Sequence, residues 1–190
     1  MDLDTITVAD FKAQFPRDFP YLNIYDEEVL YNIGARVYYP STELFYGCLV
    51  NGTIDILPTV SANWVLAEDS IDNYIQDSDI TRAFQEAKQV FNQALWGTDE
   101  SITLGFLYVT AYFLVQDIRA SMAGIMANGY FPVNSRSVGN VSESYSIPAS
   151  FTEDPLLSMY TANAYGIKYL TMVLPMLRGN VVPVCGATRP

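Results

Sequence analysis

The chain has 190 residues, half of them apolar, with a net charge of −11 and a sequence pI near 4.2. It can bury enough surface to fold, and its acidity excludes a protein that grips nucleic-acid phosphates with clustered Lys and Arg. It has no histidine and two cysteines, which excludes Ser-His-Asp and Cys-His nucleophiles and a zinc site within one chain.

Charged residues make up 16% of the chain, against about 25% in an ordinary soluble domain. Interface cores are poor in Lys and Glu and rich in aromatic residues, and this chain has 14 tyrosines. The composition therefore favours a protein that buries surface against partners, with a tyrosine-rich monomer as the alternative.

The first ten residues lack the basic and apolar regions of a signal peptide. The longest apolar run, residues 104–115, is about half as long as a membrane span and is typical of a buried core helix. We therefore expect a protein made in the cytoplasm, without a membrane partner. Cys48 and Cys185 are expected to be reduced thiols, and a disulfide between them is the alternative.

The first two predicted helices cover residues 8–15 and 26–38. Thr7 and Asp10 match a variant of the capping box at the start of the first helix. Three acidic residues begin the second helix, apolar residues follow at helical spacing, and Pro40 closes it.

A β-hairpin is predicted next. Two apolar and β-branched runs, 44–50 and 53–57, flank Asn51-Gly52, a pair that accepts the positive φ angles of a tight hairpin turn. The acidic stretch 68–79 after them does not match an EF-hand loop and is expected to be a solvated loop.

Three longer helices are predicted in the second half. One covers residues 79–95 and ends at Gly97, and the next covers 100–127, with Gly129 just past its end. The second is apolar nearly all round, which indicates the central helix of the fold.

The last predicted helix starts at Asp154-Pro155, a good cap and first-turn pair. Its apolar stripe continues to Leu174, a bend or break is expected near Ala162, and Pro175 should end it.

Between these helices, residues 133–147 are rich in serine but carry apolar residues on one strand face, and Gly139-Asn140 marks a second hairpin turn. An isolated hairpin is marginal in water, so it should pack on its own helices or on a neighbouring subunit. The apolar C-terminal segment 179–190 needs cover in the same way.

The fold class that follows is mainly α. We expect a single domain over residues 1–178, a four-helix bundle with an excursion at 41–78 and a hairpin at 133–147, followed by an extended tail.

The sequence gives little support for a catalytic site. Two pairs of carboxylates could act as acid and base: Glu68 with Asp72, and Glu143 with Asp154. Both pairs lie in segments that are expected to be exposed, so burial would not raise the pKa of one member of the pair. No phosphate-binding glycine motif occurs. We therefore expect no enzyme, no metal and no cofactor.

Several sequence pieces occur in one order: TVADFKAQFPRDF, a helix beginning DEEVL, a helix ending in LWG, the long apolar helix, SRSVGNVSESYS and AYGIKYL. This order resembles a family of tailed-phage virion proteins, the short head-tail connectors, also called adaptor or head-completion proteins. The most specific match is 135–146, supported by 164–170. The resemblance covers 5–40 and 79–175, whereas 41–78 has no counterpart.

The resemblance implies a virion protein of the neck that forms a dodecameric ring beneath the portal protein and above a tail or tail-terminator (stopper) protein. It implies that the hairpin reaches a neighbouring subunit, that the tail docks on the portal, and that DNA passes through the ring without specific binding. An acidic lumen suits this passage because it repels phosphate. The interaction residues expected on these grounds are Arg136, Ser137, Val138, Gly139, Asn140, Val141, Ser142, Tyr145, Val181, Val182 and Val184.

Two alternatives stay open. The first is another virion part, such as a tail terminator or a decoration protein, with the hairpin at 44–57 as its interface. The second is a hydrolase or a carbohydrate-binding module, in which Trp64 would stack on a sugar.

Overall fold

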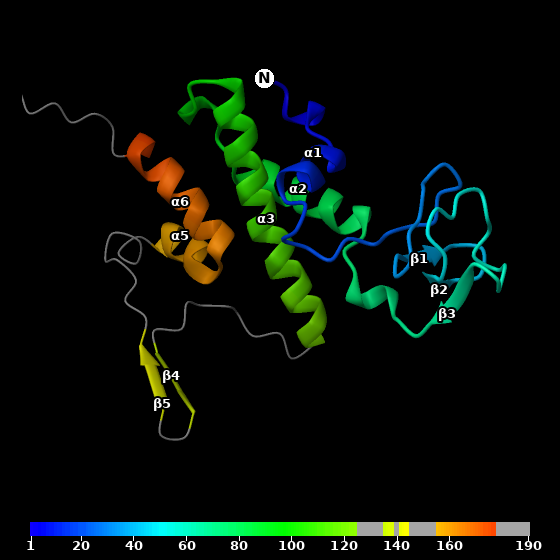
Figure 1. The fold of residues 1–190 in the computed structure, drawn as a ribbon. Coiled ribbons are helices and arrows are strands. Elements are labelled where there is room, and N and C mark those ends of the chain that lie inside the picture. The colour runs from blue at the N-terminus through cyan, green and yellow to red at the C-terminus, as the bar shows by residue number, and fades with distance from the viewer. Residues whose placement is uncertain (125–134, 139–140, 145–154, 178–190) are drawn as a thin grey trace, which may run out of the picture. The chain divides into compact units, whose positions relative to one another are not determined.

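The computed structural model describes residues 1–124, 135–138, 141–144 and 155–177. About half of these residues are helical, and they include a small three-stranded antiparallel sheet (Figure 1). The chain divides into two compact units, which are described separately: unit 1 contains residues 1–14 and those from 80 onward, and unit 2 contains residues 15–79. Unit 2 includes the whole of the excursion expected at 41–78.

The α-helices and strands are α1 (Val8–Gln14), β1 (Arg36–Tyr39), β2 (Leu44–Cys48), β3 (Trp64–Ala67), α2 (Asp77–Val90), α3 (Asp99–Ala123), β4 (Ser135–Val138), β5 (Val141–Ser144), α5 (Pro155–Ser158) and α6 (Ala164–Leu177). Short 3₁₀ helices accompany them: η1 (Leu3–Thr5), η2 (Ile71–Asn73), η3 (Gln93–Leu95) and η5 (Met159–Ala162).

The helices of unit 1 meet through a series of aromatic contacts. Phe11 of α1 lies edge-on to Phe84 of α2, with ring centroids 6.2 Å apart, and Phe84 stacks on Phe106 of α3 at 5.6 Å. Phe106 in turn contacts Phe91 at 5.5 Å, and Phe91 stacks on Trp96. This series buries the apolar stripe of α2 against α3, as the spacing of its apolar residues predicts.

Helix α3 is the central helix of unit 1, as its composition predicts, and it packs against α6. By length and composition it is also long and apolar enough to cross a membrane; half of its most apolar stretch is buried inside the protein, and the core helix of a soluble protein meets the same criterion.

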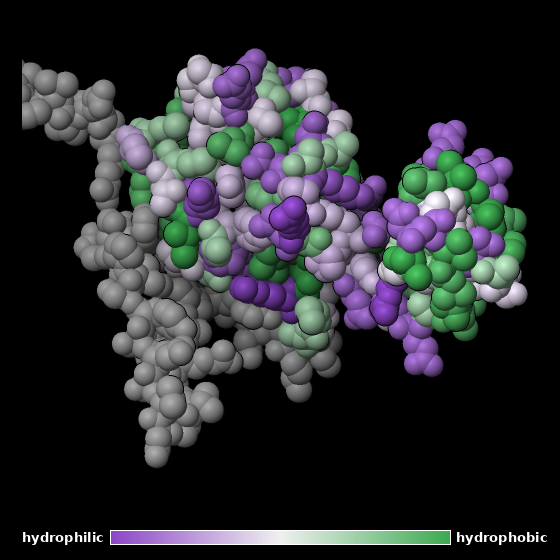
Figure 2. Space-filling view, in the orientation of Figure 1, coloured by the Kyte–Doolittle hydropathy of each residue, from purple (hydrophilic) through white to green (hydrophobic). Residues whose placement is uncertain are grey.

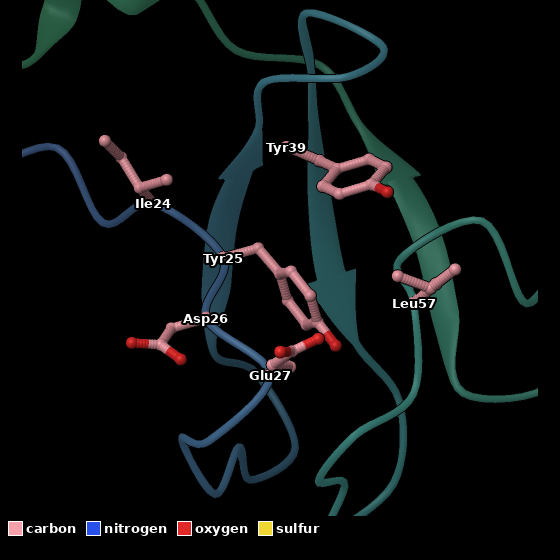
Figure 3. Close-up of a pocket in the computed structure, with 6 residues that line it drawn as sticks. All are labelled: Ile24, Tyr25, Asp26, Glu27, Tyr39 and Leu57. Carbon is pink, nitrogen blue, oxygen red and sulfur yellow. The ribbon is translucent and has the colours of Figure 1, made fainter.

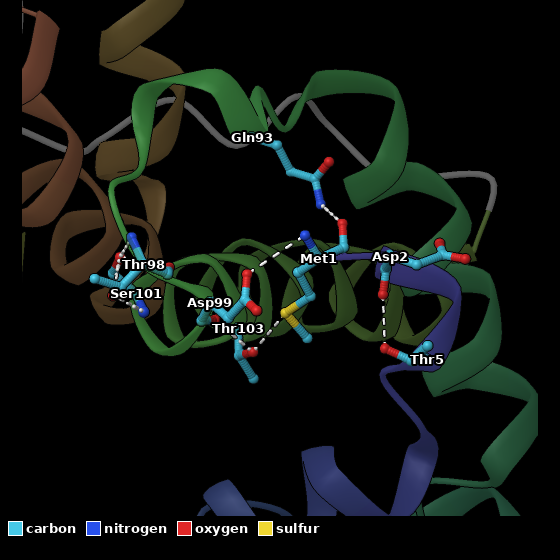
Figure 4. A network of polar contacts seen from close by, with 8 residues as sticks. All are labelled: Met1, Asp2, Thr5, Gln93, Thr98, Asp99, Ser101 and Thr103. Atoms are coloured by element: carbon cyan, nitrogen blue, oxygen red, sulfur yellow. Dashed lines mark hydrogen bonds and ion pairs between the residues drawn. The ribbon is translucent and has the colours of Figure 1, made fainter.

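The start of α3 is held by polar contacts (Figure 4). Thr98 and Ser101 form a capping box, each side chain bonded to the other residue's backbone N–H at 3.2–3.3 Å. The amino group of Met1 lies 3.4 Å from the Asp99 carboxylate, and Gln93 Nε2 donates to the Met1 carbonyl oxygen at 2.8 Å. These contacts join the N-terminal residue and η3 to the first turn of α3.

Two predicted helix ends are wrong. Helix α2 ends at Val90 rather than near 95, because the Asn92 side chain accepts from the Ala94 N–H and starts the separate turn η3. Helix α3 ends at Ala123 rather than 127, with Gly124 as its C-cap at φ +55°. Each end has a local cap that apolar spacing alone does not reveal.

The predicted break in the last helix is confirmed, with α5 and η5 before Ala162 and α6 after it. Asn163 begins α6: its Oδ1 accepts from the Gly166 N–H at 2.9 Å, and its Nδ2 donates to the Tyr112 carbonyl oxygen of α3 at 3.1 Å. The predicted stop at Pro175 is wrong, because α6 continues through it to Leu177.

Unit 2 is a small antiparallel sheet in the order β1-β2-β3. Its core contains Tyr31, Val37, Tyr46, Cys48 and Trp64. The side chains of the last four share one sheet face, since Val37 lies opposite Tyr46 and Cys48 opposite Trp64. Cys48 is a buried free thiol, and Cys185 lies outside the described residues.

The predicted helix over 26–38 is wrong. This segment turns at Gly34, where φ is +86°, and ends in β1. Tyr31 forms a backbone bridge with Thr53, and Leu30 and Ile33, two residues that suggested a helical stripe, are exposed. The helical spacing of the apolar residues does not reflect a buried helix face. The residues of this segment that pack into the core are Tyr31 and Val37.

The predicted hairpin over 44–57 is also wrong in its pairing. Gly52 does have a positive φ, +76°, but β2 pairs with β1 on one side and with β3 on the other. The turn at Asn51 instead binds the segment before β1, since Asn51 Oδ1 accepts from the Ile33 N–H at 3.0 Å.

Candidate interaction surface

The hairpin predicted within 133–147 is confirmed over its described part. Strands β4 and β5 pair antiparallel, with Val138 opposite Val141 and Arg136 opposite Glu143. Of the predicted interaction residues, Arg136, Ser137, Val138, Val141 and Ser142 therefore lie together on one ribbon, whereas Gly139, Asn140, Tyr145, Val181, Val182 and Val184 lie outside the described residues. Among the described elements, β4 and β5 have their main contacts with each other.

Unit 2 carries an apolar surface, of which the sequence predicted only the part at 44–57, as the interface of the alternative virion role. Many large apolar side chains are exposed there, and Figure 2 shows them around β1–β3. They are Ile24, Val29, Leu30, Ile33, Leu44, Leu49, Val50, Ile54, Leu57, Val60, Val65 and Leu66. Exposed apolar surface of this density is typical of a surface that binds a partner.

Strand β3 is at the outer edge of the described sheet. The outer edge of β1 is covered, because Tyr38 exchanges backbone hydrogen bonds with residues 23 and 25 at 2.7 and 2.9 Å. No described strand pairs with the far side of β3. Val65 is 50% exposed and Leu66 is 58% exposed, on opposite faces of the strand.

The hydrogen-bond pattern defines which backbone groups of β3 face outward. The Leu49 N–H donates to the Asn63 carbonyl oxygen at 2.8 Å, and these two residues lie directly opposite each other. Because bonded and non-bonded pairs alternate in an antiparallel ladder, Val65 bonds to β2 and Leu66 points its N–H and C=O away from it. Among the described residues, no strand therefore pairs with the N–H and C=O of Leu66 at this edge.

Unit 2 also holds most of the protein's net negative charge. Residues 15–79 include eleven Asp and Glu residues and two Arg residues, a net charge of −9, against −11 for the whole chain. Glu43 and Glu68 are exposed beside the ends of β2 and β3. The apolar surface therefore belongs to a strongly acidic unit, which favours a basic partner.

Asp69 lies in the acidic stretch 68–79, which was expected to be a solvated loop, but its side chain is held by several hydrogen bonds. Its carboxylate accepts from Tyr74 Oη at 2.7 Å and from Asn73 Nδ2 and the Ser70 N–H at 2.9 Å, and Arg36 lies 3.4 Å away. The hydrogen bonds from Asn73 and Tyr74 lower the pKa of Asp69 to about 2. Asp69 thus holds η2 against β1 and supports the sheet.

A pocket of about 450 Å³ lies in unit 2, lined by Ile24, Tyr25, Asp26, Glu27, Tyr39 and Leu57 (Figure 3). The Tyr25 hydroxyl is buried and has no hydrogen-bond partner among the described residues. Burial, together with the charge of Asp55, raises the pKa of Tyr25. Tyrosine faces beside carboxylates suit a guanidinium or ammonium group.

The structure gives little support to the carboxylate pairs and the sugar-binding tryptophan considered from the sequence. Glu68 and Asp72 are exposed, and Asp154 lies outside the described residues. Trp64, the suggested sugar platform, is 2% exposed, and its Nε1 donates to the Ile56 carbonyl oxygen at 2.8 Å, so it offers no open face. Within the described residues, no group of three or more potential metal ligands comes together.

Comparisons of the chain with family models, with curated proteins and with solved structures each found no match.

The sequence does hold a signal for the surface of unit 2. Trp64–Ala67 is a strand whose consecutive residues are all apolar, so both of its faces are apolar, and an acidic stretch follows it directly. Such a strand is expected to be buried on both sides. That it is an edge strand depends on which segments pair with β2, and the residues of β3 alone do not determine this.

Proposed function

We propose that this chain is a head-tail connector subunit of a tailed-phage particle. It would assemble into a ring, dodecameric by the resemblance, in the neck of the virion between the portal and the tail, and DNA would pass through its channel. The observation that carries the proposal is the antiparallel ribbon β4–β5, which lies in the segment where the resemblance is most specific.

The ribbon suits a contact between subunits. Two strands alone are marginal in water, and β4 and β5 have their main described contacts with each other. A neighbouring subunit would supply the missing surface. In this proposal α1, α2 and α3, joined through Phe84 and Phe106, and α6, which packs against α3, form the four-helix bundle that carries the ribbon.

The charge of the chain supports passage of DNA rather than binding. A net charge of −11 with scattered basic residues repels phosphate, so DNA would slide through an acidic channel without sticking.

The ring is tested by mass photometry of the full-length protein. We expect a discrete ring for the wild type and its loss when residues 135–144 are replaced by a Gly-Ser linker of equal length, with the far-UV circular dichroism of the helices retained. Val90→Ser, at an exposed position of α2, is the control and should leave the ring intact. A ring that survives the linker replacement would contradict the role given to β4–β5.

A second candidate, a tail terminator or decoration protein, is favoured by the exposed apolar surface of unit 2, which could be the main interface in place of the ribbon. Substitution of Leu66 by Ser distinguishes the two. Loss of assembly in Leu66→Ser, with the linker variant unaffected, would favour this second function. The carbohydrate-binding alternative loses support because Trp64 is buried.

A further inference from the structure

The pocket of unit 2 has an aromatic wall that the core holds in place. Tyr25 and Tyr39, which both line the pocket, meet edge to face with ring centroids 5.7 Å apart. Tyr31 stacks on Tyr25 at 5.8 Å, and Tyr46 lies edge-on to Tyr39 at 6.4 Å. Because Tyr31 and Tyr46 are buried core residues, the two pocket rings are positioned before a ligand arrives, and ordering them on binding costs little entropy.

The charged groups at this pocket are all negative. Asp26 and Glu27 line it with exposed carboxylates, and within the part of the chain that the structure describes neither pairs with a Lys or Arg side chain. Burial, and then the charges of Asp55 and Glu27, raise the pKa of Tyr25. The pocket therefore combines aromatic rings with negative charge that no described basic group neutralises, which favours a cation as its occupant.

Glu27 is the carboxylate best placed to receive that cation. The Asp26 carboxylate already accepts from the Glu28 N–H at 2.9 Å, whereas the Glu27 carboxylate has no hydrogen-bond partner among the described residues. The Tyr25 hydroxyl is likewise buried without a described partner, and Figure 3 shows it beside Glu27. A donor with several N–H groups would satisfy both side chains at once.

The residue types select a guanidinium among cations. A guanidinium is planar, so it can stack on a tyrosine ring while it donates two parallel hydrogen bonds to a carboxylate. A metal ion fits less well, because no group of three or more potential metal ligands comes together in the described residues.

We propose that the pocket of unit 2 binds the side chain of an arginine carried by another protein, with the guanidinium against the Tyr25 and Tyr39 rings and paired with the Glu27 carboxylate. Ile24 and Leu57 at the pocket, 55% and 48% exposed, contact apolar residues beside that arginine. A second copy of unit 2 is a poor partner, because it has the same net charge of −9. The proposal does not depend on ring formation or on the connector function.

An NMR titration of the ¹⁵N-labelled full-length protein tests the proposal with three peptides. The first is acetyl-Leu-Arg-Leu-amide, and the other two have citrulline or lysine in place of arginine. Citrulline retains the planar shape without the charge, and lysine retains the charge without the planar shape. We expect the arginine peptide to shift the amide resonances of residues 24–27 until they saturate, the citrulline peptide to bind at least about tenfold more weakly, and the lysine peptide to bind more weakly than the arginine peptide.

Two variants separate the pocket from the general charge of unit 2. Glu27→Gln removes the carboxylate that pairs with the guanidinium and should weaken the arginine peptide by about tenfold. Glu68→Gln is the matched control, because it removes the same charge from an exposed position of unit 2 that does not line the pocket. Its effect on the affinity should stay below about twofold.

Equal weakening in Glu27→Gln and Glu68→Gln would overturn the proposal, because it would show a general attraction to an acidic unit. Equal affinity for the arginine and citrulline peptides, or for the arginine and lysine peptides, would also overturn it, as would an arginine peptide that leaves the resonances of residues 24–27 unchanged. Resonances of these residues that shift with protein concentration in the absence of peptide would identify a second copy as the occupant and would contradict the assignment to another protein.

Discussion

Gly166 of α6 lies directly against the carbonyl oxygen of Tyr160, so closely that a Cβ at position 166 would stand 2.0 Å from that oxygen and 2.6 Å from the Tyr112 ring. A glycine in a helix costs about 1 kcal/mol relative to alanine. Here it lets the start of α6 approach both η5 and α3, so the cost in propensity is offset by packing.

Gly166→Ala is therefore expected to destabilise the protein, although alanine is the better helix former. Overpacking at a closed site costs on the order of 1–3 kcal/mol, and the free energy of unfolding in urea should fall by about that amount. Gly97→Ala is the matched control: a Cβ there meets no atom within 4 Å, and its effect should stay within about 0.5 kcal/mol. A neutral or stabilising Gly166→Ala would contradict the described contact.

The hydrogen bonds of the Asp69 carboxylate should make the stability of unit 2 depend on pH in the acid range. Its pKa is lowered to about 2 in the folded state, whereas an unfolded Asp titrates near pH 4. Its contribution to stability is therefore full above about pH 4 and is lost as the pH falls from 4 toward 2. Thermal unfolding of the wild type and Asp69→Asn at pH 5, 4, 3 and 2 measures this, and the difference between the two proteins should shrink as the pH falls. A constant difference would show that the carboxylate charge plays no part.

Trp64 is predicted to act as a core residue. Trp64→Ala should cost about 3–5 kcal/mol and also leave the Ile56 carbonyl oxygen without its 2.8 Å donor. Trypsin cleavage after Arg36, within β1, then becomes fast, and Trp64→Phe, which preserves most of the volume, should show an intermediate rate. If Trp64→Ala resists trypsin as the wild type does and loses glycan binding, the carbohydrate-binding function gains support instead.

How far the sequence predicts the fold depends on the range of the contacts. The first helix is predicted well because Thr7 and Asp10 form a reciprocal cap within four residues, at 2.8 and 3.3 Å. The break before α6 is likewise local, since Asn163 caps Gly166. Unit 2 is predicted poorly because its core joins Tyr31 to Trp64, 5.3 Å apart between ring centroids but far apart in sequence.

The same distinction applies to the candidate site. The ribbon β4–β5 follows from a turn signal and alternation within a dozen residues, and its described pairing is confirmed. The sequence does not predict that β3 is an edge strand, because this depends on which segments pair with β2, and those segments are β1 and β3. The residues of the tail, Val181, Val182 and Val184, lie outside the described residues and stay a prediction from sequence.

The central claim, that this chain is a connector subunit, is tested most directly by mass photometry of the full-length protein mixed with the portal protein encoded in the same genome. The connector proposal predicts a discrete ring, or stoichiometric addition of this chain to the portal, and loss of either in the variant in which a Gly-Ser linker replaces residues 135–144. A protein that stays monomeric and leaves the mass of the portal unchanged would contradict the proposal.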